Sequence, residues 1–539
     1  MSLKFDTPEL RNLGRILLTH AERNPDGIYL MADEQRLSFG ATNELANRFA
    51  AGLLELGIRR GDRVAIYMRP SINVVVLALA ANKIGAVWTP VNTDYKGVWL
   101  KDALTDSRPT VVATDAGLLA NVLAAEGDTA RPYRLLCDFG DSAPAQSGDV
   151  TSLADFRNLP ANEPDMRAIQ YGDTAAILWT SGTTGKPKGV MQSHNAWIRS
   201  SESGIRTSNI ESDSTTYTCL PFYNSAAWVT AVLPSLVAGI PCGLDPHFSV
   251  TSFWDRIRHY GATHTLTLGA MHMFLWNAPE RDDDADNPLR IAYMVPMPDA
   301  IVEPFCRRFG LEKINQGYGQ SEIMALIVRS SASGAKQWKP NALGEPLNDL
   351  ILTLRDDAGS EVPAGQHGEF CVKPLAPHVI FNGYFDQPEQ TKNAFHGDWY
   401  RTGDLGVRDD EGNFFFVDRK KDVIRYKGRN ISSLQVEHIA ARHPAVAAAA
   451  AFGIPSQELE HEHEIKLDVI LKPDQTLNAD ELARFINDNA PYFFVPRYIE
   501  FVSELPYTPT NKIEKYKLRS RGVNAATWDR DASGFEVKR

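Results

Sequence analysis

The sequence is poor in cysteine, and the few cysteines that it has follow no pattern. They number five in 539 residues, an odd count without the spacing that metal sites use. This argues against a disulfide framework or a zinc site and favours a reducing compartment. The five are Cys137, Cys219, Cys242, Cys306 and Cys371.

Long apolar runs are also scarce. The first six residues, Met-Ser-Leu-Lys-Phe-Asp, lack the apolar centre of a secretion signal. The apolar stretch at residues 74–81 is stopped by Asn82 and Lys83, well short of the length that crosses a bilayer. We therefore predict a cytoplasmic protein without an integral membrane segment.

Positive charge is in deficit. The chain has 56 lysines and arginines against 67 aspartates and glutamates, a net charge of −11. Such a balance argues against nonspecific binding to nucleic acid. An anionic substrate would have to meet a local positive field, since the overall field is negative.

The pattern of apolar residues predicts two kinds of domain. In the first part, helical stripes such as residues 43–55 alternate with buried strands such as residues 63–68, which is typical of sheets flanked by helices. The charged residues 418–422 interrupt this alternation, and shorter elements follow. We predict an α/β fold with a large N-terminal domain of helix-flanked sheets at residues 1–418 and a small α+β domain at residues 419–539.

One loop points to chemistry. Residues 180–189 read Thr-Ser-Gly-Thr-Thr-Gly-Lys-Pro-Lys-Gly and follow the apolar run at residues 175–179. Small residues let several backbone N–H groups and hydroxyls converge on one ligand, and two lysines add positive charge. The loop therefore predicts a phosphate cradle. It is not a Walker A loop, because Lys186 is followed by Pro187 where that motif needs serine or threonine.

With this loop the chain resembles the adenylate-forming superfamily of acyl-CoA synthetases, luciferases and nonribosomal adenylation domains, and lies closest to the acyl-CoA synthetases. The resemblance extends from residue 10 to residue 520. Its further motifs are residues 318–322 (Tyr-Gly-Gln-Ser-Glu), 383–384 (Gly-Tyr), 388–389 (Pro-Glu), 400–404 (Tyr-Arg-Thr-Gly-Asp), 418–422 (Asp-Arg-Lys-Lys-Asp), 427–432 (Lys-Gly-Arg-Asn-Ile-Ser) and 506–512.

The resemblance implies a role for particular residues. Lys512 is the catalytic lysine that bridges the attacking carboxylate and the α-phosphate, and Glu322 is a second catalytic group that binds Mg²⁺. Lys421 is the hinge of a mobile C-terminal domain, and Lys427, Gly428 and Arg429 bind coenzyme A. The ATP and AMP contacts are Thr180, Ser181, Gly182, Thr183, Thr184, Gly185, Lys188, Tyr318, Gly319, Ser321, Asp404 and Arg419.

An acyl pocket is expected between three segments, residues 222–228, 268–276 and 294–297. Its predicted lining includes Asn224, Trp228, Met271 and Met297, a largely apolar and adaptable set. Methionines and aromatics at helical spacing are also common in plain protein core, so each could equally be core. No acidic residue stands out there to bind an ammonium group, which argues against an amino acid as substrate.

Three positions depart from the superfamily pattern. Asn224 stands where histidine is frequent, and residues 293–298 (Tyr-Met-Val-Pro-Met-Pro) replace a turn that contains two glycines. Asn511 stands where glycine precedes the catalytic lysine, although asparagine tolerates left-handed backbone better than most residues. The first two changes raise the alternative that adenylation is impaired and that the enzyme thioesterifies a supplied acyl adenylate.

We predict an ATP-dependent acyl-CoA synthetase, an acid–thiol ligase that converts a hydrophobic carboxylic acid through its acyl adenylate to the CoA thioester. ATP, Mg²⁺ and coenzyme A are the expected cofactors. A ligase that loads a carrier protein remains an alternative, and whether the chain forms a homodimer stays open. A nucleotide-binding regulator without turnover is disfavoured, because binding alone would not need Lys512 beside Glu322, Asp404 and Arg419.

Overall fold

The computed structural model describes residues 5, 7–126, 131–140, 149–180, 187–330, 338–426, 429–456, 463–507 and 513–538, without the side chains of residues 330, 429 and 430. The chain divides into two compact units. Unit 1 comprises Met1–Ile351 and Lys373–Asp398, and unit 2 comprises Leu352–Val372 and Trp399–Arg539.

Unit 1 contains a sheet of seven described strands in the order β7-β6-β5-β3-β4-β8-β9. All neighbouring strands are parallel except β8 and β9, which form an antiparallel pair. The strands are β3 (Arg63–Tyr67), β4 (Val87–Pro90), β5 (Val111–Asp115), β6 (Arg134–Asp138), β7 (Val150–Ser152), β8 (Thr174–Thr180) and β9 (Lys188–Ser193).

A second sheet of unit 1 has nine described strands in the order β16-β15-β14-β13-β12-β10-β11-β1-β2. Its centre is parallel, and each end has an antiparallel strand. The strands are β1 (Ile28–Ala32), β2 (Gln35–Ser38), β10 (Thr216–Thr218), β11 (Cys242–Leu244), β12 (His264–Leu268), β13 (Ile291–Val295), β14 (Lys313–Tyr318), β15 (Ile327–Ser330) and β16 (Glu345–Pro346).

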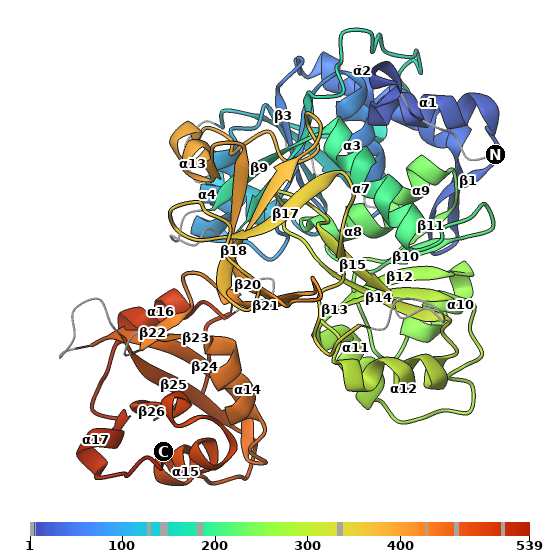
Figure 1. Ribbon diagram of the computed structural model, residues 1–539. Helices are drawn as coiled ribbons and strands as arrows, with labels where there is room; N and C mark the ends of the chain where they lie inside the picture. Colours follow the sequence, from blue (N-terminus) through green and yellow to red (C-terminus); the bar gives the residue numbers. More distant parts are fainter. Residues whose placement is uncertain are drawn as a thin grey trace. The chain divides into compact units, whose positions relative to one another are not determined.

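Helices connect and cover these strands (Figure 1). They are η1 (Pro8–Leu10), α1 (Leu13–Arg23), α2 (Phe39–Glu55), α3 (Ile72–Lys83), α4 (Gly97–Ser107), α5 (Leu119–Glu126), α6 (Leu153–Phe156), α7 (His194–Thr207), α8 (Ser225–Ala227), the π-helical turn η2 (Trp228–Val232), α9 (Leu233–Ala238), α10 (Phe253–Tyr260), α11 (Ala270–Asn277), α12 (Asp299–Phe309) and α13 (Pro388–Asn393). The short strand β19 (Phe395–His396) also belongs to unit 1.

The apolar stretch at residues 74–81 forms the interior of α3. Nearly every side chain of this helix is buried, which is typical of a helix that is apolar on all sides and lies inside a protein. Even Lys83 is buried, where it forms an ion pair with Glu163. Among the described residues, no helix is both long and apolar enough to cross a membrane.

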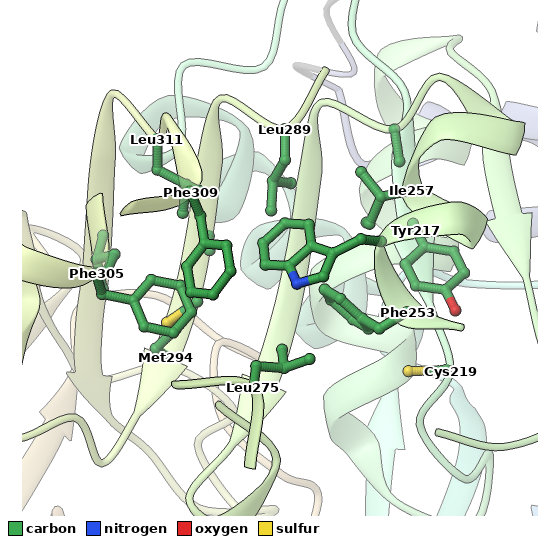
Figure 2. Packing of buried hydrophobic residues seen from close by; sticks show 14 of the residues in the cluster. Tyr217, Cys219, Phe253, Ile257, Leu275, Leu289, Met294, Phe305, Phe309 and Leu311 are labelled. Atoms are coloured by element: carbon green, nitrogen blue, oxygen red, sulfur yellow. The ribbon is translucent and has the colours of Figure 1, made fainter. Parts of the chain in front are cut away.

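The nine-stranded sheet holds a large aromatic core. Figure 2 shows part of it, with Phe305 and Phe309 next to each other and Tyr217 close to Phe253. The ring centroids of Phe305 and Phe309 lie 4.5 Å apart. These side chains come from α10, α12 and the strands beneath them, so they fix the helices against the sheet.

Unit 2 begins with an antiparallel sheet in which β18 pairs with β20 and β20 with β21. A hairpin, β22 with β23, and a four-stranded sheet, β24-β25-β26-β27, follow among the described residues. Helices α14 and α15 share the core of the last sheet (Figure 1, orange to red). The elements are β17 (Leu350–Arg355), β18 (His367–Pro374), β20 (Trp399–Arg408), β21 (Phe414–Arg419), β22 (Ile424–Tyr426), β23 (Arg429–Ile431), α14 (Ser433–Ala441), β24 (Val446–Pro455), β25 (His463–Leu471), α15 (Ala479–Asn489), η3 (Tyr492–Phe494), β26 (Tyr498–Phe501), α16 (Lys515–Arg521), β27 (Trp528–Asp529) and α17 (Arg530–Ser533).

The predicted α/β fold with a smaller C-terminal α+β part is confirmed. The compact units do not divide the chain at residue 418, because residues 352–372 and 399–418 group with the C-terminal part. Compactness does not test which segments move, so the mobile domain that begins at residue 419 stays a prediction.

Candidate active site

The predicted phosphate cradle lies at the end of the β8–β9 hairpin in unit 1. Thr180 and Lys188 are partners in the antiparallel register. The indole N–H of Trp179, one residue earlier, donates to Thr89 Oγ1 at 3.0 Å and ties the hairpin to β4. The loop tip at residues 181–186 lies outside the described residues, and with it the predicted contacts Ser181, Gly182, Thr183, Thr184 and Gly185.

The second predicted motif closes the hairpin between β14 and β15, also in unit 1. Tyr318 ends β14, and its carbonyl accepts from the N–H of Leu326 at 3.0 Å. A Cβ at Gly319 would lie 1.9 Å from the carbonyl oxygen of Met324, so the tight loop requires glycine there. This loop presents the half-buried side chains of Ser321 and Glu322.

Side chains from other elements hold this loop. The Gln192 side-chain amide, on β9, donates to the carbonyl oxygen of Ser321, and the N–H of Phe381 donates to the carbonyl oxygen of Glu322 at 2.8 Å. The Tyr384 hydroxyl donates to Glu322 Oε1 at 2.9 Å. The hairpin that carries Lys188 and the loop that carries Glu322 are thereby connected within unit 1.

Asp404 and Arg419 come together in unit 2. They are partners in the register of β20 and β21, and Arg419 Nε lies 3.6 Å from Asp404 Oδ1. The Asp404 side chain is 4% exposed and that of Arg419 is 40% exposed. A carboxylate held in this way can accept hydrogen bonds from two neighbouring hydroxyls, as a ribose offers. Both residues were predicted from their motifs.

Glu369, which the sequence did not single out, organises the same region. Its Oε1 accepts from the N–H of Gly403 at 3.0 Å, and its Oε2 accepts from Arg401 Nη2 at 2.8 Å and Lys420 Nζ at 2.9 Å. Burial lowers the pKa of Lys420, but its ion pairs with Asp357 and Glu369 outweigh that and raise it. One buried carboxylate thus fixes the residues that precede Asp404 and follow Arg419.

The predicted hinge residue Lys421 has an exposed side chain. Partial desolvation of its ammonium group lowers its pKa; the charge of Asp422 opposes this shift, and those of Arg419 and Arg519 add to it. The preceding strand end is anchored by Asp418, whose carboxylate accepts from the N–H groups of Arg419 at 2.7 Å and Ser433 at 2.6 Å. The end of β21 is therefore tied to the first turn of α14.

The other residues of the C-terminal part to which a role was assigned lie outside the described residues. This holds for Lys427, Gly428 and the catalytic candidate Lys512, together with Asn511. Arg429 begins β23, so only the course of its backbone is known. Their assignments remain predictions.

The residues predicted to line the acyl pocket are buried to different degrees. Trp228 is buried, its indole N–H donates to the carbonyl oxygen of Phe222 at 2.8 Å, and its ring centroid lies 4.2 Å from that of Trp88. Met297 is buried in the core shown in Figure 2, and Met271 packs against that core from its edge. Asn224 is half-buried at the start of α8. The pocket remains a prediction.

The segment that replaces the glycine-containing turn is firmly held. The N–H of Met297 donates to Gln316 Oε1 at 3.2 Å, and His272 Nε2 donates to the carbonyl oxygen of Pro296 at 2.8 Å. Burial lowers the pKa of His272, which keeps the ring neutral. Both partners lie in elements that flank the segment, one on α11 and one on β14.

The donor groups suit a metal that a nucleotide brings with it. No cluster of three or more histidine, cysteine, aspartate or glutamate side chains that could hold a metal is present among the described residues. Mg²⁺ is usually bound by one or two carboxylates together with substrate phosphates, and Glu322 beside the Lys188 hairpin matches that arrangement.

Comparison with known proteins decides the family. Residues 17–385 match the AMP-binding enzyme family. The chain belongs to this family. Residues 435–512 match the C-terminal domain of the same AMP-binding enzymes, which confirms the predicted adenylate-forming superfamily.

Relatives of this AMP-binding enzyme are ligases of coenzyme A. The crotonobetaine/carnitine–CoA ligase of Salmonella agona is 29% identical over 491 residues, which cover 90% of this chain and 93% of that protein. Similar solved structures include the Mycobacterium tuberculosis fatty acyl CoA synthetase, with 26% identity and a TM-score of 0.74. The match covers 96% of this chain and 99% of the chain of that synthetase.

A further structure shows the shared fold. ATP-bound MatB from Rhodopseudomonas palustris has a TM-score of 0.81 at 24% identity and covers 95% of this chain and 99% of its own. The predicted class of enzyme, an AMP-forming acid–thiol ligase, agrees with the names of the relatives.

Proposed function

We propose that this AMP-binding enzyme is an ATP-dependent acyl-CoA synthetase that activates a hydrophobic carboxylic acid through its acyl adenylate. The observation that carries the proposal is the likeness over 90% of the chain to a relative named as a CoA ligase. The paired Asp404 and Arg419 and the linked Lys188 and Glu322 supply groups that the first half-reaction needs.

The first half-reaction joins two anions, so the chain must supply positive charge and alignment. Lys188 neutralises phosphate charge, and Asp404 holds the ribose. Mg²⁺ bound at Glu322 would offset further negative charge on the phosphates. Lys512 bridges the carboxylate and the α-phosphate in the transition state, where the charge develops.

In the second half-reaction the thiol of coenzyme A attacks the acyl adenylate and releases AMP. Lys427 and Arg429 contact phosphates of coenzyme A, and Gly428 lets the thiol arm approach the backbone. A rotation about Lys421 exchanges Lys512 for this loop between the two steps.

The acid is proposed to be apolar. Met271 and Met297 belong to or border an apolar core. The three segments expected to line the pocket, residues 222–228, 268–276 and 294–297, contain no aspartate or glutamate. An ammonium-bearing substrate would therefore find no carboxylate partner at these residues. Free coenzyme A is proposed as the acceptor, because the relative that matches 90% of this chain is named as a CoA ligase.

One observation favours a second candidate, a ligase that thioesterifies a supplied acyl adenylate. Residues 296–298 contain two prolines and no glycine, and contacts from Gln316 and His272 hold them in place. A rigid segment with side chains at this point restricts close approach of a ligand to the backbone.

Three assays separate the candidates. In the first assay, a panel of apolar acids is incubated with ATP and coenzyme A, and thioester formation is measured. In the second, the same acids are incubated with ATP and labelled pyrophosphate, and exchange is measured. In the third, synthetic acyl adenylates are incubated with coenzyme A, and thioester formation is measured. The first candidate predicts exchange and thioester with the same acid. Thioester from adenylates without any exchange would favour the second candidate, and no product in any assay would contradict both.

A further inference from the structure

Tyr384 contacts two residues assigned to the phosphate site. Its hydroxyl donates to Glu322 Oε1 at 2.9 Å, and Lys188 Nζ lies 4.6 Å from the centre of its ring. The side chain is 5% exposed. One tyrosine therefore contacts both the cation assigned to phosphate and the carboxylate assigned to metal.

Backbone contacts fix the position of Tyr384. Residues 381–385 run beside β9, where Tyr384 forms a bridge with Val190 and Phe385 N–H donates to the carbonyl oxygen of Gly189 at 2.7 Å. The N–H of Tyr384 donates to Thr391 Oγ1 at 2.9 Å. The segment that carries the ring is thus paired alongside the strand that carries Lys188.

The same segment holds Glu322 by its backbone as well. The N–H of Phe381 donates to the Glu322 carbonyl oxygen at 2.8 Å, and the Phe381 and Tyr384 ring centroids lie 5.0 Å apart. Both the backbone and the side chain of Glu322 therefore take their position from residues 381–384.

We propose that Tyr384 is a positioning residue. Its hydroxyl orients the Glu322 carboxylate to bind a metal ion, and its ring holds the Lys188 ammonium group where a phosphate can bind it. The proposal rests on the proposed function. A hydroxyl orients a carboxylate by hydrogen bonding and leaves its negative charge in place. A lysine in the same place would neutralise that charge. A cation over a ring is held by a weak attraction that a phosphate can replace.

The charges near the ring support this reading. Lys188 forms no ion pair with any described residue, although Glu322 contacts the hydroxyl of the same tyrosine. Opposite charges in direct contact would attract strongly and would have to be separated before a metal and a phosphate could bind. Lys188 instead lies over the ring of Tyr384.

The test compares Tyr384→Phe with Tyr217→Phe. Tyr217 is the matched control, because its buried hydroxyl donates to the carboxylate of Asp245 at 2.8 Å in the core of the other sheet. Mn²⁺ binding in the presence of a nonhydrolysable ATP analogue is measured by electron paramagnetic resonance. The Mg²⁺ dependence of pyrophosphate exchange is measured in parallel, as is CoA thioester formation from a synthetic acyl adenylate.

Tyr384→Phe should raise the dissociation constant of Mn²⁺ by about tenfold, as expected for the loss of a hydrogen bond to a charged group. The Mg²⁺ concentration for half-maximal exchange should rise similarly, whereas the rate at saturating Mg²⁺ and the use of acyl adenylate should change little. Tyr217→Phe should leave metal affinity unchanged. Equal metal affinity in wild type and Tyr384→Phe would overturn the proposal, as would an equal loss of metal binding and adenylate use.

A double-mutant cycle guards against a purely structural effect. If the hydroxyl acts through Glu322, Tyr384→Phe should weaken Mn²⁺ binding no further in a Glu322→Gln background. Additive losses would contradict the proposal. Binding of the metal together with the nucleotide does not require a carboxylic acid. The failure of every acid in the exchange assay would therefore contradict the proposed function, whereas Mn²⁺ binding would still test the role of Tyr384.

Discussion

Asp404 illustrates how a single residue combines local strand pairing with a predicted chemical task. The register of β20 and β21 places it opposite Arg419, and the carboxylate is nearly inaccessible to solvent. Asp404→Asn would keep the shape but remove the charge, so its hydrogen bonds to ribose hydroxyls would become weaker.

We expect Asp404→Asn to lower kcat/KM for ATP by about 10–100-fold, which corresponds to about 1.5–3 kcal/mol for hydrogen bonds to a charged group. The measurement is pyrophosphate exchange at varied ATP. Asp410→Asn, in the exposed turn after β20, is the control and should behave as wild type. Equal kcat/KM for both variants would show that Asp404 does not bind the nucleotide.

Residue contacts far apart in sequence were the hardest to predict. Asp404, Arg419 and Glu322 were found because each stands in a short motif. The contact of Tyr384 with Glu322 spans 62 positions, and nothing local to either residue indicates it. Tyr384 was visible only as half of a Gly-Tyr pair. Glu369 carried no sequence signal because its donors come from two segments, residues 401–403 and Lys420, that lie far from it in the sequence.

At the scale of elements, the periodicity of apolar residues predicted most positions well. The expected helix at residues 43–55 is the later part of α2, and the expected strand at residues 63–68 is β3. The start of α2 was missed by four residues because Ser38 caps it, accepting from the N–H of Ala41. Helix α3 has almost no exposed face, since nearly every side of it is buried.

Helix α3 offers a stability test. Leu77 is fully buried, whereas Leu54 at the exposed face of α2 is 45% exposed. Leu77→Ala should lower the free energy of unfolding by about 2–5 kcal/mol, because it removes packed methyl groups and leaves a cavity. Leu54→Ala should cost far less. The measurement is denaturant unfolding of the whole chain, and equal losses would contradict the placement of α3 in the core.

Strand β25 contains a buried acid whose ionisation should affect stability. Burial raises the pKa of Asp468 to about 6 from the usual 3.8, although Lys466 favours its charged form. The unfolded chain therefore loses this proton at lower pH than the folded chain. The contribution of Asp468 to stability is present below about pH 4 and is lost as the pH rises through about 6.

Asp468→Asn should remove this loss of stability with rising pH. At pH 7.5 the variant should be more stable than wild type by on the order of 1–3 kcal/mol. Unfolding midpoints measured between pH 4 and pH 7.5 test this. Asp474→Asn, at an exposed turn after β25, should keep the slope of the wild type. An unchanged slope in Asp468→Asn would show that this carboxyl ionises normally in the folded protein.

At the scale of the whole molecule, the order of motifs predicted the family, because they occur in sequence along most of the chain. The division into compact units is a separate matter from the predicted mobile domain at residues 419–539, which stays a prediction. A charged segment at residues 418–422 marked the change of pattern, but residues 367–372 pair with β20, and residues 352–372 group with the C-terminal unit. Long-range strand pairing of this kind leaves no periodic signal in the sequence.

The measurement that tests the proposed function most directly compares wild type with Lys512→Ala in both half-reactions. Acid-dependent pyrophosphate exchange and CoA thioester formation from a synthetic acyl adenylate are measured on the same preparations, with Lys472→Ala as an exposed lysine control. Lys512→Ala should slow exchange by about 100-fold or more, because it removes a cation at the developing charge, and should leave thioester formation from the adenylate largely intact. Exchange at the wild-type rate in Lys512→Ala would contradict the proposed mechanism.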